Sequence, residues 1–136
     1  MGILHGTIVE ETTGEKLDAK VHVLNAMGNF SHPHNSLLKR GPGTQFFFSD
    51  GEFETRGSRG RTDILVERGT EYEPYRTTVE LPEKGCVDIE IRLRRWHHPQ
   101  ERHWYPGNTH IHYDENEKQP DRRLGIDCSV EGYNVT

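Results

Sequence analysis

Hydrophobic and polar residues alternate along most of this sequence as far as residue 94. The clearest run is 87–93, where Val87, Ile89, Ile91 and Leu93 are separated by charged residues. Successive side chains of a β-strand point to opposite faces, so this alternation predicts half-buried strands. Strands are expected in seven runs, at residues 3–9, 19–23, 46–48, 52–55, 62–68, 75–81 and 87–93. Turn residues between the runs complete the pattern of an all-β, seven-stranded antiparallel sandwich.

One of these runs consists of three consecutive aromatic residues, Phe46, Phe47 and Phe48. An Asp-Gly pair at positions 50 and 51 follows it and predicts a hairpin to the next strand. Because neighbouring side chains point to opposite faces, at least one phenyl ring must lie on the outer face of the sheet. Either this strand is covered on both faces, or a ring is exposed and packs against a partner.

The character of the sequence changes after Trp96. Residues 96–107 are polar and without periodicity, which predicts a linker. A short strand is expected at 108–112, and a polar loop is expected over 113–123. A short helix then follows, with Asp127 as its N-cap and Gly132 at its end. The sequence therefore predicts three segments: a sandwich at 1–95, a linker at 96–107 and an irregular C-terminal tail at 108–136.

Composition limits the partners of the chain. The formal net charge is −5, which argues against nucleic acid as the main partner. The sequence contains no apolar stretch long enough to predict a membrane-spanning helix, so no membrane partner is expected. The N-terminus lacks the pattern of a signal peptide, so a cytoplasmic location is the default expectation.

The candidate chemistry lies in two histidines, His110 and His112. Their spacing places both imidazoles on one face of the expected strand, from which they can reach one metal ion. A catalytic zinc ion usually has three protein ligands and a bound water, so two histidines alone do not make a site. No nucleophile motif is present, and we therefore predict no catalytic residue in the chain itself.

The order of the motifs resembles a known architecture. Residues 13–21 are similar to the opening of prealbumin-like, carboxypeptidase-regulatory-type sandwiches, and the similarity continues through residues 49–53, 67–72, 92–96 and 104–112. Together they resemble the N-terminal region of PHP-type metallohydrolases of the CehA/McbA kind, in which such a sandwich precedes a distorted (β/α) barrel. The resemblance implies that His110 and His112 are ligands of a divalent zinc, manganese or iron ion in a complete barrel. The sequence departs from the family at Asn108, where Asp is frequent.

These patterns and the resemblance lead to two hypotheses for the function. The first is a non-catalytic accessory sandwich of a metal-dependent hydrolase, whose partner is the hydrolase domain or another protein surface. The alternative is a standalone ligand-binding or adhesion-type sandwich, in which the loop at residues 30–45 recognises the ligand. The segment after Trp96 separates the two, because a standalone module has no need of it.

Overall fold

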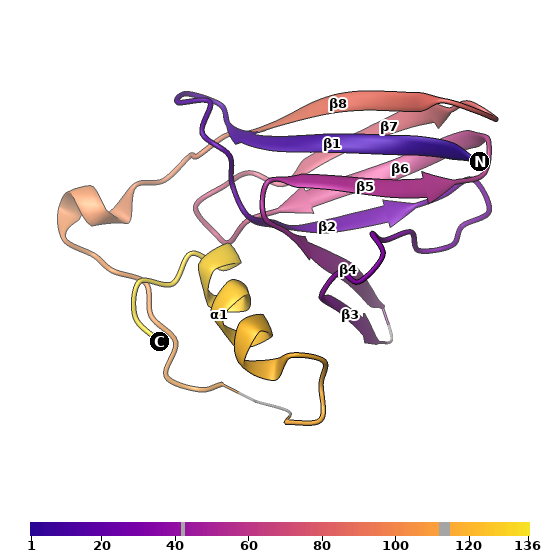
Figure 1. Cartoon of the computed structure of the whole chain (residues 1–136). Helices are drawn as coiled ribbons and strands as arrows, with labels where there is room; N and C mark the ends of the chain where they lie inside the picture. Colours follow the sequence, from indigo (N-terminus) through magenta and orange to yellow (C-terminus); the bar gives the residue numbers. More distant parts are fainter. Residues whose placement is uncertain (42, 112–114) are drawn as a thin grey trace.

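A computed structural model of the chain describes residues 1–41, 43–111 and 115–136. Two β-sheets face each other and enclose one core, as the all-β prediction required (Figure 1). The strands are β1 (Gly2–Glu10), β2 (Ala19–Leu24), β3 (Leu38–Gly41), β4 (Thr44–Ser49), β5 (Glu52–Gly57), β6 (Gly60–Glu67), β7 (Tyr75–Leu81) and β8 (Cys86–Leu93).

The smaller sheet has the order β5-β1-β8 and corrects the expectation of a purely antiparallel sandwich. β1 pairs with β5 in the antiparallel sense, but it pairs with β8 in parallel, from Ile3 opposite Cys86 to Glu10 opposite Leu93. The alternation of residues fixes which face of a strand is buried, and it says nothing about the direction of the neighbouring strand. The parallel pairing of β1 and β8 could therefore not be predicted from the alternation of residues.

The larger sheet has the order β3-β4-β2-β6-β7, with antiparallel pairs throughout. It contains the strand that raises the total to eight in the described residues, against the seven that were predicted. The additional strand, β3, lies inside the segment expected to be a loop and forms the edge of the sheet beside β4. Four residues with lysine and arginine in the middle carry too little alternation to be recognised.

The core between the sheets is built from the inward side chains of both. Leu4 and Ile8 of the smaller sheet are fully buried, as are Val21 and Phe47 of the larger sheet. A glycine in β1 makes room for one aromatic ring of this core. A Cβ atom at Gly6 would lie 2.3 Å from the ring of Phe53, which is its partner across the β1–β5 pair.

The C-terminal segment is more regular than the sequence predicted. A 3₁₀ turn, η1 (Pro99–Arg102), interrupts the expected linker, and an α-helix, α1 (Pro120–Val130), lies within the expected tail. The expected helix between Asp127 and Gly132 is thus wrong in its start, because Pro120 occupies the first turn, where proline is well tolerated. The expected strand at 108–112 is absent from residues 108–111, and His112 lies outside the described residues. No helix in the described part of the chain is long and apolar enough to span a membrane.

The register of β8 gives a direct test of the sandwich. Ile91 is fully buried and Glu90 is exposed, while Ile89 is only partly buried against the core. We expect Ile91→Ala to lower the free energy of unfolding by about 2–5 kcal/mol, because the truncation leaves a cavity. Glu90→Ala should change it by less than about 0.5 kcal/mol. Chemical denaturation measures both, and equal losses at the two positions would contradict the register.

Candidate functional site

The structure describes only one of the two histidines that the sequence predicted as metal ligands. His110 is exposed, and its backbone N–H donates a hydrogen bond to Oδ1 of Asn108 at 2.9 Å. His112 lies outside the described residues. Over the described ranges, no group of three or more His, Cys, Asp or Glu side chains is arranged to hold a metal ion. These residues therefore do not fit a complete metal site, since a catalytic zinc needs three protein ligands.

The segment that carries His110 nevertheless has a defined geometry. Gly107 and Val135 form a parallel β-bridge, in which the N–H of Asn108 donates to the carbonyl of Val135 at 3.0 Å. Between these two points the chain forms α1 (Figure 1). Two parallel extended segments joined by a helix have the connectivity of a βαβ unit.

Helix α1 packs on the outer face of the larger sheet, beside β4. Its buried Val130 and partly buried Ile126 form a second hydrophobic cluster with Leu37, Phe46 and Phe48. Phe47, between the two phenylalanines, points the opposite way into the main core. The strand is thus covered on both faces, which was one of the two outcomes that the aromatic triplet allowed.

Polar contacts surround this second cluster. Lys20 of β2 forms ion pairs with Asp127 and Glu131 of the helical segment. The carboxylate of Asp18 accepts hydrogen bonds from Ser129 and from Arg68, whose Nε lies 3.2 Å away. Burial lowers the pKa of Lys20, although Asp127 acts in the opposite direction. Helix α1 is therefore attached by charged groups at the edge of an apolar contact.

A second polar network ties the linker to the sandwich. Glu71 is only 7% exposed, and its carboxylate accepts hydrogen bonds from Arg95 at 3.1 Å and from Gln100 at 3.0 Å. Gln100 also donates to the side chain of Asn134, near the C-terminus. Trp96 donates from its indole N–H to the carbonyl of Thr70 at 2.8 Å. Sequence reasoning missed this network, because the partners of Glu71 are 24 to 29 residues away and no local pattern joins them.

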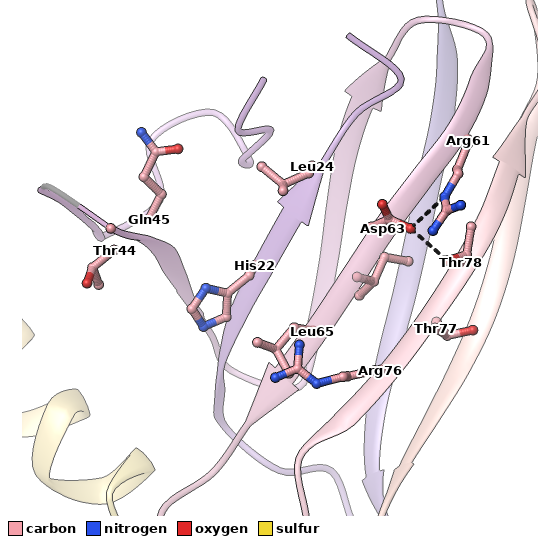
Figure 2. A pocket seen from close by; sticks show the side chains of 12 residues that line it. His22, Leu24, Thr44, Gln45, Arg61, Asp63, Leu65, Arg76, Thr77 and Thr78 are labelled. Carbon is pink, nitrogen blue, oxygen red and sulfur yellow. Dashed lines mark hydrogen bonds and ion pairs between the residues drawn. The ribbon is translucent and has the colours of Figure 1, made fainter. Parts of the chain in front are cut away.

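A hollow lies on the larger sheet, away from the part that α1 covers. Figure 2 shows its lining side chains, which project from β2, β4, β6 and β7. Asp63 lines the hollow and accepts hydrogen bonds from Thr78 at 2.7 Å and Arg61 at 3.0 Å, which together hold the pKa of its carboxyl below the ordinary value. Arg76 and the 44% exposed Leu24 add a second guanidinium and an apolar surface. The arrangement suits a polar ligand with some apolar character.

The loop expected to recognise a ligand lies next to this hollow only at its end. Thr44 and Gln45 line the hollow, whereas most of residues 30–45 lie elsewhere and include β3. Within the loop, Arg40 donates to Nε2 of His32 at 2.8 Å. The expectation that residues 30–45 recognise a ligand stays a prediction.

Comparison with known proteins identifies the fold only. No family model and no curated protein matches the chain. Among solved structures, it is similar to GBS52, the minor pilin of the gram-positive pathogen Streptococcus agalactiae, with a TM-score of 0.52 and 16% identity over 72% of this chain and 46% of that one. It is also similar to BcpA, the major pilin subunit of Bacillus cereus, with a TM-score of 0.45 and 14% identity over 69% of this chain and 30% of that one.

The chain therefore spans less than half the length of either pilin. The similarity to GBS52 establishes a β-sandwich like that of a pilin domain. At 16% identity this similarity shows the fold alone, and no comparison supports the accessory domain of a hydrolase.

A glycine at the contact between α1 and the sandwich makes this contact testable. Gly69 has φ +58°, and a Cβ atom there would lie 2.4 Å from the carbonyl oxygen of Glu131. We expect Gly69→Ala to displace the end of α1 and to increase hydrogen exchange of the amides in 120–135. Gly14→Ala is the matched control, because Gly14 has φ +73° and no atom within 4 Å. Equal exchange at 120–135 in the two variants would show that the close approach is unimportant.

Proposed function

We propose that the chain is a non-catalytic β-sandwich module that holds a second protein domain, whose opening βαβ unit is the C-terminal segment. The parallel bridge between Gly107 and Val135 across α1 carries this proposal. All-parallel sheets occur almost only with helices on both faces, and an isolated pair of strands is at best marginally stable. We therefore expect further strands to extend this bridge. The proposed division is a sandwich at 1–95, a linker at 96–107 and the start of a second domain at 108–136.

The sandwich has the contacts needed to position such a domain. The Glu71 network fixes the linker, and the second hydrophobic cluster fixes α1 on the sheet. Several large apolar side chains of the linker and the C-terminal segment are exposed to solvent. Their exposure favours additional protein contacts in this part of the chain. They are Trp96, Trp104, Tyr105, Ile111 and Val135.

The identity of the second domain follows from the sequence resemblance. A PHP-type barrel of the CehA/McbA kind would begin at this βαβ unit, behind a prealbumin-like sandwich. His110 comes shortly after Gly107 in the sequence, and (β/α) barrels place their sites at the carboxyl ends of their strands. We therefore assign His110 and His112 as ligands of a divalent metal ion in a longer form of the protein, a metal-dependent hydrolase. The remaining ligands would come from residues beyond this chain.

A specific observation favours a second candidate function, a standalone ligand-binding or adhesion-type module. The hollow around Asp63 is open on the sheet face and is lined by polar groups and apolar side chains. The β-sandwich fold shared with a pilin is compatible with this function. Binding of a saccharide or peptide by the chain, lost in Arg76→Ala, would favour this candidate over the first.

Zinc titration of the chain tests the first candidate. Because the described residues contain no group of three ligands, we expect weak binding of zinc by calorimetry at neutral pH and no hydrolase activity. In a longer form with the complete barrel, His110→Ala should reduce bound metal and turnover and leave sandwich stability unchanged. His34→Ala, an exposed histidine of the loop, is the control in that form. Full metal content and turnover in His110→Ala would overturn the assignment, and so would nanomolar zinc affinity of the present chain.

A further inference from the structure

A groove rich in basic side chains shares no lining residue with the hollow that contains Asp63 and does not include His110. It has a volume of about 500 Å³. Residues in the range 32–40, which include the first part of β3, form one part of its lining, and residues 117, 118 and 123 near the start of α1 form the other. Four lysine and arginine side chains line it, together with one carboxylate, that of Glu117. The cations are Lys39, Arg40, Lys118 and Arg123. A chain with a net charge of −5 thus gathers positive charge at one concave place.

Most of this charge lacks an anionic partner in the part of the chain that the structure describes. Arg123 donates to Glu117, but Arg40 donates instead to Nε2 of His32. The other ring nitrogen of His32, Nδ1, lies 3.0 Å from the carbonyl oxygen of Pro33. In the described residues, Lys39, Arg40 and Lys118 form no ion pair with a carboxylate.

A second observation at this groove concerns a buried hydrogen-bond donor of Arg123. Its Nε is buried and has no hydrogen-bond partner among the residues that the structure describes. Buried donors are nearly always paired in native proteins, so an unpaired one calls for an acceptor.

We propose that this groove binds a small phosphate-type oxyanion, either free phosphate or the phosphate of an organic ester. Guanidinium groups match the geometry of phosphate oxygens and form strong charge-assisted hydrogen bonds with them. Arg40 of β3 and Arg123 of α1 supply two such groups, and Lys39 adds an ammonium group. The site does not depend on the C-terminal segment being part of a hydrolase.

Titration of the full chain at constant ionic strength tests the proposal. Inorganic phosphate and glycerol 3-phosphate are the two probes, and backbone amide chemical shifts report binding. We expect saturable shifts at residues 32–40 and 117–123 with at least one probe. Tighter binding of glycerol 3-phosphate would identify an ester as the ligand, whereas equal or tighter binding of inorganic phosphate would identify the free ion.

Two exposed positions supply the variants, so that folding is preserved. Lys39→Gln combined with Arg40→Gln should weaken binding on the order of tenfold or more. Arg92→Gln is the matched control, because Arg92 is exposed on β8 in the other sheet. Shifts that do not saturate with either probe, or the same loss of affinity in the control, would overturn the proposal.

Discussion

The aromatic triplet of β4 imposes the constraint on which the rest of the structure depends. Three consecutive phenylalanines in a strand place rings on both faces of the sheet, so a single sandwich core cannot bury them all. Phe47 fills the core between the sheets, and Phe46 and Phe48 require a cover on the outside. Helix α1 is that cover. The C-terminal segment is therefore an integral layer of this protein and not a loose tail.

This outer layer links the fold to the proposed function. Because α1 is fixed on the sheet, the extended segments before and after it are brought together at Gly107 and Val135. The Glu71 network holds the linker that leads to them. A second domain that continued from this unit would take its orientation from the sandwich. The same layer leaves part of the sheet open around Asp63, where the alternative binding function would reside.

Alternation of residues was sufficient to predict the sandwich and the buried face of β8, where Ile91 and Leu93 point inward. It also placed at least one ring of the aromatic triplet on the outer face, without deciding between a cover on that face and an exposed ring that packs against a partner. Strand β3 escaped prediction because a short charged edge strand has no buried periodicity. The parallel β1–β8 pair and the partners of Glu71 join residues that are distant in sequence, and local patterns do not encode such contacts. The role of His110 stays a prediction, since it depends on ligands that the described residues do not supply.

A double-mutant cycle between the sheet and the helix measures whether α1 covers β4. Phe46→Ala, Val130→Ala and the double variant are compared with the unmodified chain by chemical denaturation. Because both residues belong to the second hydrophobic cluster, we expect an interaction energy of about 0.5–3 kcal/mol. Phe53→Ala combined with Val130→Ala is the control and should be additive, since Phe53 belongs to the main core. Additive effects of Phe46→Ala and Val130→Ala would show that α1 does not cover the outer face of β4 in solution, and would contradict the assignment of the C-terminal segment as an integral layer.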